Sequence, residues 1–129
     1  RETGCSFGNP PFTGTSWIVE NEQGEIGAFL IGFRSQDDPQ VCYIHFVGVD
    51  PALRRSGIAR QLYLLFFQTM KDLGCTQVRA ITGSFNRRSQ AFHAALGFEA
   101  HGDREIDGVL AYPDYDGPGE PRVAFSRGL

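Results

Sequence analysis

Apolar residues are concentrated in two stretches near the start of the chain, "SWIVE" (residues 16–20) and "EIGAFLIGF" (25–33). Both are rich in β-branched and aromatic residues, and the turn-forming cluster "NEQG" separates them, so together they predict a β-hairpin. A further turn, "SQDDPQ", precedes "VCYIHFVGV", which predicts a third strand over Val41–Val49. Three consecutive antiparallel strands are therefore expected.

The apolar period changes to that of a helix between Gly57 and Leu73. The apolar stripe is predicted to contain Ile58, Leu62, Leu65, Phe66, Thr69 and Leu73, widened by Tyr63, Phe67 and Met70. Gly74 is typical of a left-handed cap that ends such a helix. "QVRAIT" (Gln77–Thr82) then alternates like a strand. Because a helix joins it to Val41–Val49, we expect these two strands to pair in parallel.

The last third of the chain predicts a shorter helix and further strands. Asn86 is a good N-cap for a helix over "RRSQAFHAAL", with Phe92, Ala95 and Leu96 facing inward and Gly97 ending it. "FEA" is expected to return as a strand, "HGDREIDGVLAYPDYDGPGEP" to form mostly ordered loop, and "RVAFS" to form the last strand. The pattern predicts a single α+β domain over residues 1–129.

Composition and charge exclude several classes of protein. The chain has 12 Lys and Arg against 15 Asp and Glu, a net charge of −3, and this interleaved balance does not favour nucleic-acid binding. Cys5, Cys42 and Cys75 lack C-x-x-C spacing, which predicts free thiols in a reducing cytoplasm and no metal site. With no signal-peptide pattern and no apolar run of about 20 residues, we expect a cytoplasmic protein without a membrane span.

The stretch "VDPALRRSGIA" joins the third strand to the long helix and has the properties of an anion site. A helix N-terminus leaves backbone N–H groups unpaired and carries partial positive charge. Gly57 and the small Ala59 allow a ligand to approach the backbone, and Arg54 or Arg55 can add charge-assisted bonds to phosphate oxygens. The loop therefore suits a pyrophosphate. The alternative is that Gly57 is only a turn residue and the arginines are solvated.

Two separated motifs resemble the GNAT superfamily of acetyl-CoA-dependent N-acetyltransferases. The first is the family's Arg/Gln-x-x-Gly-x-Gly/Ala loop with its lead-in, matched by Val49, Pro51, Arg54, Gly57 and Ala59. The second is "NRRSQAFHAALGF", matched by Asn86, Ser89, Phe92, Gly97 and Phe98. The resemblance implies a three-layer fold with a mixed, mostly antiparallel central sheet, one splayed parallel strand pair, and helices on its faces.

The resemblance also implies a cofactor site. The loop amides would bind the pyrophosphate of acetyl-CoA, the backbone of the third strand would pair with its pantetheine arm, and the thioester would lie in the slot beside that strand. In the family the motif asparagine commonly bonds the pantetheine region, which is compatible with N-capping. The cofactor-binding residues so implied are Val47, Gly48, Val49, Arg54, Arg55, Ser56, Gly57, Ile58, Ala59 and Asn86.

Acetyl transfer needs an oxyanion donor and a proton for the leaving thiolate. We expect direct attack by an amine in a ternary complex, with the backbone N–H of Val47 or Gly48 as the oxyanion donor. Seven residues after the motif asparagine the family usually carries a tyrosine acid, but this chain carries His93. We predict that His93 takes this role, since even a neutral imidazole donates one N–H. The alternative is a surface histidine without a catalytic part.

A base for the incoming ammonium is sought on the third strand. Period-two alternation predicts that Tyr43, His45, Val47 and Val49 share one face. Tyr43 stands where some relatives carry a glutamate base, but a phenol does not readily accept a proton near neutral pH. His45 is therefore the predicted base, with a packed or hydrogen-bonded histidine as the alternative.

The residues that would surround the acceptor amine follow the family pattern less closely. Family members ordinarily begin with a strand and two helices, and "RETGCSFGNPPF" is too short and too rich in Gly and Pro for two helices. Either the acceptor side is open, or another chain closes it, or residues are absent from the printed sequence. The acids and tyrosines of "DGVLAYPDYDGPGEPR" would suit a cationic acceptor, or form only a solvated loop.

Two functions follow. The first is an N-acetyltransferase acting on a primary amine of a small molecule or peptide. The second, motivated by the missing tyrosine, glutamate and helices, is a non-catalytic acyl-CoA-binding sensor or assembly module. Both are compatible with a homodimer.

Overall fold

The computed structural model describes residues 4–11 and 13–129, which form two compact units. The first unit runs to Thr76 and also takes in Leu129, and the second comprises Gln77–Gly128. Each unit has its own antiparallel strands and its own α-helix, which confirms the predicted α+β class. Neither helix in these ranges is both long and apolar enough to span a bilayer.

The first unit contains four antiparallel strands that lie side by side in chain order. They are β1 (Ser6–Gly8), β2 (Trp17–Glu20), β3 (Ile26–Arg34) and β4 (Val41–Val49). The last three confirm the predicted hairpin and third strand, whereas β1 was not predicted. Of the stretch expected to lack helices, "RETGCSFGNPPF", residues 1–3 and 12 lie outside the described residues.

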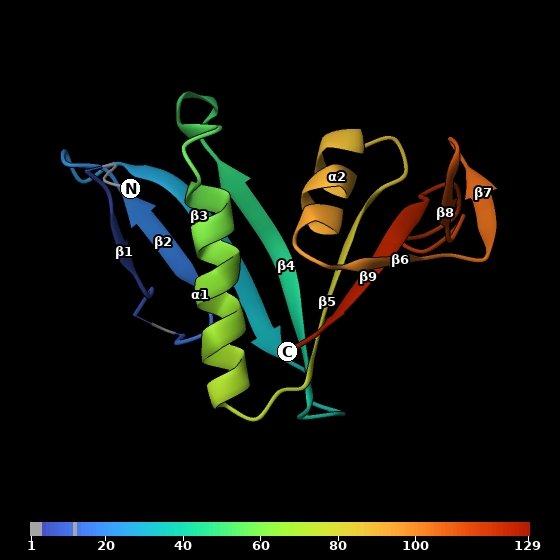
Figure 1. The fold of residues 1–129 in the computed structure, drawn as a ribbon, viewed down its shortest axis with the longest axis horizontal. Coiled ribbons are helices and arrows are strands. Elements are labelled where there is room, and N and C mark those ends of the chain that lie inside the picture. Colours follow the sequence, from blue (N-terminus) through green and yellow to red (C-terminus); the bar gives the residue numbers. More distant parts are fainter. Residues whose placement is uncertain (1–3, 12) are drawn as a thin grey trace. The chain divides into compact units, whose positions relative to one another are not determined.

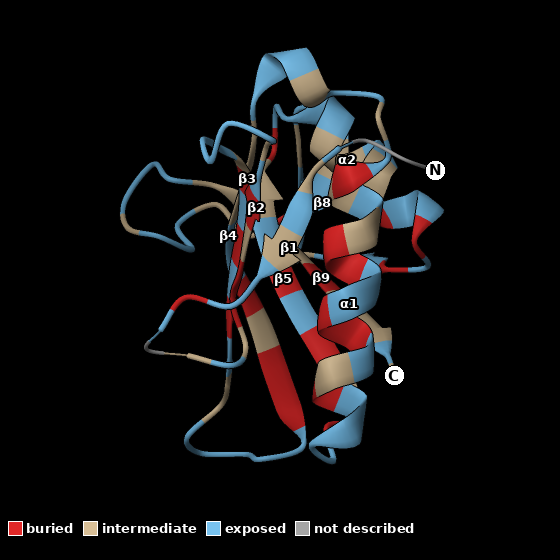
Figure 2. Ribbon diagram, turned by 90° about the vertical axis from the view of Figure 1, so that its left-hand side faces the viewer, coloured by how far each residue is buried: buried red, intermediate tan, exposed pale blue. Residues whose placement is uncertain are grey.

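Helix α1 (Ile58–Asp72) lies along β3 and β4 (Figure 1). Its buried residues, part of the red in Figure 2, are Ile58, Leu62, Tyr63, Phe66, Phe67 and Met70. Phe66 packs against Gly32 so closely that a β-carbon there would lie 2.3 Å from the ring. Leu65 and Leu73 are exposed, so the prediction that they join the buried stripe is wrong. The stripe follows the spacing 58, 62, 66, 70, which turns both leucines away from the sheet.

The opposite face of this sheet carries large apolar side chains that remain exposed. They are Phe29, Ile31, Phe33 and Phe46. The alternation of β3 places its three members on one face, while Ala28 and Leu30 on the other face are buried with α1. The first unit therefore covers only one face of its sheet with its own described helix.

The second unit is built around β9 (Arg122–Gly128), which pairs antiparallel with β5 (Gln77–Gly83) on one side and β6 (Glu99–His101) on the other. Helix α2 (Arg87–Ala95) follows β5 in the chain, and β7 (Arg104–Ile106) pairs with β8 (Val109–Ala111) (Figure 1). The core of this unit includes Val78, Ala80, His93, Leu96, Phe98, Val123 and Phe125. Ala95 is exposed, so its predicted inward position is wrong.

The β7–β8 hairpin lies where the sequence predicted loop. Its turn residues Asp107 and Gly108 have φ angles of 54° and 81°, the left-handed values that a two-residue hairpin turn needs at both central positions. An Asp-Gly pair between Ile106 and Val109 is the sequence signal for such a turn. The density of Gly, Pro and Asp around it concealed that signal.

Candidate functional site

The junction between β4 and α1 is held in place by contacts with β3. The amide of Asp50 donates to the carbonyl of Gly27 at 2.7 Å, and its carboxylate accepts from the amide of Ala52 at 2.9 Å. This carboxylate caps the short 3₁₀ helix η1 (Pro51–Leu53). Leu53 packs against Gly27, where a β-carbon would lie 2.5 Å from its methyl group. The junction is therefore a fixed platform for the residues that follow.

The next turn brings the chain into α1 through two left-handed residues. Arg55 has φ of 67° and Gly57 has φ of 86°. A positive φ is uncommon outside glycine and points to a functional constraint. Left-handed residues in a turn can direct nearby amides toward one concave side, an arrangement that binds anions. The amide of Ser56, however, already donates to the carbonyl of Leu53 at 3.2 Å, so it is committed within the loop.

The N-terminus of α1 has no cap of its own. Gly57 is the N-cap residue, no side chain bonds the first turn, and that turn contains no acidic residue. Within the described part of the chain, no acceptor is recorded for the amides of Arg55, Gly57, Ile58 and Ala59. Arg54, Arg55 and Gly57 are exposed, and nothing lies within 4 Å of the position of a β-carbon on Gly57. Ile58 is fully buried, so it is the amides of Arg55, Gly57 and Ala59, together with the helix dipole, that can attract an anion from solvent.

The backbone of β4 has one edge committed to β3. Gly48 faces Phe29 in the same register that pairs Asp50 with Gly27, so Gly48 directs its amide toward β3. Amides alternate between the two edges of a strand, and those of Val47 and Val49 therefore point to the edge away from β3. Of the two predicted oxyanion donors, Val47 has the suitable direction and Gly48 does not.

A β-bulge interrupts β4 and changes which residues share a face. Ile31 pairs with Phe46 and Gly32 pairs with Ile44, so His45 is the extra residue.

Residues directly opposite one another on paired strands lie on the same face of the sheet. By this criterion, Tyr43 before the bulge and Val47 after it lie on opposite faces. Val47 faces Leu30 on the α1 side, whereas Tyr43 faces Phe33 on the exposed side and stacks on it with 5.5 Å between ring centroids. The prediction that Tyr43, His45, Val47 and Val49 share one face is therefore wrong. A bulge shifts the alternation by one residue, and the apolar pattern does not reveal it.

His45 lies in solvent beside aromatic rings. Its residue is exposed, and its ring centroid lies 4.2 Å from that of Phe46 and 6.3 Å from that of Phe33. The exposed imidazole on β4 can be reached by a soluble amine or by water, which a general base requires. Its catalytic role stays a prediction.

In the second unit, Asn86 closes the N-terminus of α2. Its side-chain oxygen accepts from the amide of Ser89 at 3.1 Å, which confirms the predicted N-cap. The amide of Gln90 donates to the carbonyl of Asn86 at 3.1 Å, and that of Arg87 donates to the carbonyl of Phe85 at 3.0 Å. The first turn of α2 is thus largely satisfied by the chain itself, although the side-chain amide nitrogen of Asn86 is not used by the cap.

His93 is a core residue of the second unit, with only 4% of its surface exposed. Its ring stacks on Phe125 with a centroid distance of 4.6 Å and an interplanar angle of 6°, and meets the edge of Phe98 at 5.0 Å. Burial lowers the pKa of His93, opposed by the hydrogen bond to the carbonyl of Ser89. Because that carbonyl can only accept, Nδ1 at 2.7 Å carries a proton. The neutral ring is therefore protonated on Nδ1.

Three residues that hold α2 and the β7–β8 turn were not singled out from the sequence. The side-chain amide of Gln90 donates to the carbonyls of Gly83 at 3.2 Å and Ser84 at 3.0 Å. The buried hydroxyl of Ser84 bonds the carboxylate of Asp107 at 2.7 Å, and the guanidinium of Arg87 donates to the carbonyl of Asp107. Gln90 could have been identified from the sequence, because it is a polar residue one turn before His93 on the inward side of α2.

The sequence-predicted residues thus divide between the units. The first contains the loop, the β4 backbone, Tyr43 and His45, and the second contains Asn86 and His93. The first also contains the helix start at which no side chain caps the first turn.

Comparison with known proteins identifies relatives. The model of a family described as the acetyltransferase (GNAT) family matches residues 6–98. Human N-acetyltransferase 8 is 29% identical over 90 residues, which cover 67% of this chain and 39% of that protein. The uncharacterised N-acetyltransferase YjgM of Escherichia coli is 26% identical over 83 residues, which cover 64% of this chain and 50% of that protein. The chain spans half or less of the length of these two relatives.

Solved structures share the fold. The crystal structure of Chaetomium thermophilum Naa20 in complex with a bisubstrate analogue matches 92% of this chain and 68% of its own, with a TM-score of 0.75 and 18% identity.

Proposed function

Because the chain belongs to the acetyltransferase (GNAT) family, we propose that it transfers an acetyl group from acetyl-CoA to a primary amine by direct attack in a ternary complex. One observation carries the proposal: the N-terminus of α1 leaves its amides without recorded acceptors among the described residues and has two exposed arginines beside it. Such a site suits the diphosphate of coenzyme A.

The loop fits a diphosphate in three respects. The amides of Arg55, Gly57 and Ala59 are available donors, the space beside Gly57 is open, and Arg54 and Arg55 add positive charge. When bound, acetyl-CoA supplies the acetyl thioester. The role of this chain at the loop is to hold the phosphates, with the backbone giving direction and the arginines giving charge-assisted bonds.

The β4 backbone supports the positioning step. The amides of Val47 and Val49 point away from β3, and we assign this part of the β4 backbone to pairing with the extended arm of the cofactor. In this proposal the N–H of Val47 donates to the oxyanion that develops on the acetyl carbonyl. Gly48 takes part through the shape of the strand, because its own amide faces β3.

Proton removal from the acceptor is assigned to His45. The reacting amine must lose a proton, and His45 takes it directly or through water. Tyr43 lies on the same exposed sheet face and is stacked on Phe33, so we assign it to shaping this region.

The acid role of His93 stays a prediction with a specific requirement. The neutral ring holds its one proton on Nδ1, bonded to the carbonyl of Ser89. Nε2 has a proton to give only in the imidazolium form, and burial disfavours that form. If His93 protonates the thiolate, its contribution should grow as the pH falls.

The need for a protonated His93 also favours one alternative function. A family member without a usable acid would bind acyl-CoA through the α1 loop and release no product. The burial of His93 and its Nδ1 bond support this non-catalytic sensor or assembly module.

Two measurements on one preparation test the proposal. Calorimetric titration with acetyl-CoA should show binding, and a thiol-release assay over monoamines, polyamines, aminoglycosides and peptides should show amine-dependent release of free CoA thiol. Binding without release for every amine would favour the non-catalytic alternative. Absence of binding in the folded protein would contradict both.

A further inference from the structure

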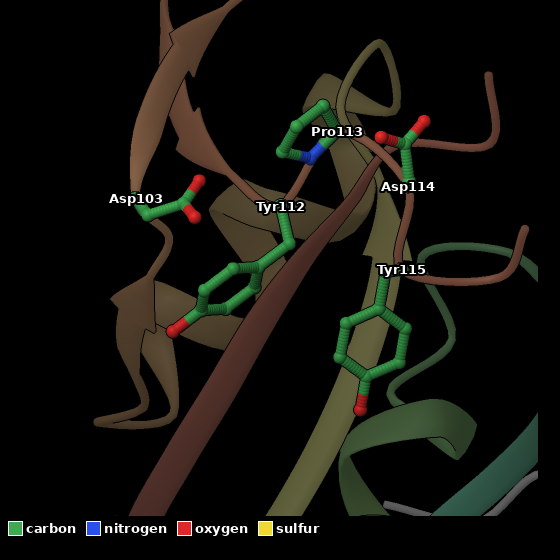
Figure 3. A pocket seen from close by; sticks show the side chains of 5 residues that line it. All are labelled: Asp103, Tyr112, Pro113, Asp114 and Tyr115. Atoms are coloured by element: carbon green, nitrogen blue, oxygen red, sulfur yellow. The ribbon is translucent and has the colours of Figure 1, made fainter. Parts of the chain in front are cut away.

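The segment after β8 forms one side of an open pocket within the second unit. The pocket has a volume of about 380 Å³ and is lined by Asp103, Tyr112, Pro113, Asp114 and Tyr115 (Figure 3). The two tyrosine rings lie side by side with 6.1 Å between centroids and a tilt of 40°. Asp103 comes from the turn between β6 and β7 and directs its carboxylate toward Tyr112 and Pro113 (Figure 3). Aromatic faces and carboxylates therefore share one cavity.

The carboxylates of this pocket are not neutralised by the protein. Arg122 is occupied by Asp116 at 2.9 Å and by Glu120 at 3.7 Å. Across the described ranges, no ion pair is recorded for Asp103 or Asp114. Residues 103–122 contain six acidic residues and two arginines, so this segment is more negative than the chain's net charge of −3. The pocket is therefore a site of negative potential.

The walls of the pocket are fixed by the chain's own hydrogen bonds. The backbone of Tyr112 bonds that of Arg122 in both directions, at 2.8 and 3.1 Å. One carboxylate oxygen of Asp114 accepts from the amide of Gly119 at 2.9 Å, which orients the side chain. A preformed pocket binds its ligand at a lower entropic cost than one that must be ordered.

This combination selects one class of ligand. Carboxylates repel anions and attract cations, and the faces of tyrosine rings attract organic cations in particular. We propose that the pocket binds an organic cation, an alkylammonium or guanidinium group, and that this group belongs to the acceptor substrate.

The assignment to the acceptor rests on the proposed function. The amine that is acetylated must react without its proton, whereas a pocket of negative potential retains a charged group. The bound cation is therefore a second basic group. The acceptor carries at least two basic nitrogens, as a polyamine or a basic peptide does.

Direct binding tests the pocket without any reaction. The probes are tetramethylammonium chloride, which cannot be acetylated, and spermidine, titrated without acetyl-CoA at matched ionic strength and followed through the NMR signals of Tyr112 and Tyr115. Both should bind, and Asp103→Asn with Asp114→Asn should weaken spermidine binding at least about fivefold. Glu105→Gln is the matched control, because Glu105 is exposed on β7 and does not line the pocket.

The possible results distinguish failure of the pocket proposal from failure of the proposed transferase function. Glu105→Gln should change spermidine binding less than about twofold, and both variants should keep acetyl-CoA binding. Equal weakening by the control and the pocket variant, or probe binding that leaves the two tyrosine signals unmoved, would overturn the pocket. Probe binding in a protein that fails to bind acetyl-CoA would retain the cation pocket and overturn its assignment to an acceptor.

Discussion

The N-termini of the two α-helices differ although both follow a strand and both have two arginines nearby. At α1 the N-cap is Gly57, and no side chain bonds the first turn. At α2 the N-cap is Asn86, which bonds the amide of Ser89, while Arg87 is tied to the β7–β8 turn. The N-terminus of α1 keeps backbone amides available to a ligand, whereas that of α2 uses its amides in hydrogen bonds within the chain. We therefore expect anion binding to depend more on amides without an acceptor than on the arginines beside them.

The difference begins in the sequence. Glycine adopts a left-handed conformation at the start of α1 and offers no oxygen to its own amides, whereas asparagine offers one at the start of α2. A phosphate can replace the missing cap only at α1. We therefore expect perturbations at α1 to change cofactor binding, and most perturbations at α2 to change stability.

The largest effect is expected from Gly57→Glu. The carboxylate would enter the open space at the loop and repel the diphosphate, so acetyl-CoA affinity should fall at least about 100-fold. Gly74→Glu is the matched control, because Gly74 also has a left-handed φ, 97°, and open space around it. Both variants carry a similar backbone strain of about 1–2 kcal/mol. Calorimetry on folded proteins should show loss of binding in the first and near-normal binding in the second; equal losses would contradict the account.

A smaller effect is expected from the arginines. Arg54→Gln and Arg55→Gln should each weaken acetyl-CoA binding about fivefold, a value near 1 kcal/mol for an exposed charge–phosphate contact. The losses should shrink as salt is added, because salt screens the wild-type contact. Arg88→Gln, exposed beside the capped α2, is the control and should change affinity less than about twofold. An Arg88 effect as large as that of Arg55 would break the contrast between the two helices.

His93→Phe should act mainly on the stability of the second unit. A phenyl ring keeps the stack on Phe125, so the free energy of unfolding near pH 7.5 should change by less than about 1.5 kcal/mol. Because burial lowers the pKa of His93, the unfolded chain binds its proton first, and this stability is lost as the pH falls below the ordinary value of about 6.5. Urea unfolding should therefore show a smaller loss in the variant than in the wild type between about pH 7.5 and pH 5.5.

The same variant tests the acid role. If His93 donates the proton, kcat should fall much more than acetyl-CoA affinity, and increasingly toward low pH. Unchanged turnover in a folded variant would remove His93 from the mechanism.

The smallest effect is expected at Asn86. Serine is as good an N-cap as asparagine, so Asn86→Ser should keep the free energy of unfolding within about 0.5 kcal/mol, whereas Asn86→Ala should lose about 1 kcal/mol. If the side-chain amide also bonds the pantetheine region, Asn86→Ser should weaken acetyl-CoA binding about threefold, as the loss of one neutral hydrogen bond does. Unchanged affinity in the serine variant would leave Asn86 with capping alone.

The sequence predicted those parts of the fold that follow a local period. Strands β2 to β4 were predicted because runs of β-branched and aromatic residues are bounded by turn-forming clusters, and helix α1 because apolar residues recur at helical spacing along it. A loop before α1 was predicted because the strand pattern breaks at Asp50-Pro51 and the helical period begins only after Gly57. Its binding of a diphosphate stays a prediction.

The remainder depends on contacts that no local pattern contains. The bulge at His45 adds one residue without changing composition, yet it places Val47 and Tyr43 on opposite faces. The position of His93 depends on Phe125, a residue of β9 that the chain reaches only after β6 and the β7–β8 hairpin. The face of α2 could have been inferred from the spacing of Ser89, His93 and Leu96, but the stack on Phe125 could not.

The central claim is that the first-turn amides of α1 bind the diphosphate of coenzyme A. It is tested most directly by a ¹⁵N–¹H NMR titration with inorganic pyrophosphate and then with coenzyme A. The account predicts that the amide signals of Gly57, Ile58 and Ala59 move with both ligands, while those of Ser89 and Gln90 move with pyrophosphate little or not at all. Unmoved signals at the start of α1, in a protein whose other signals show it to be folded, would contradict it.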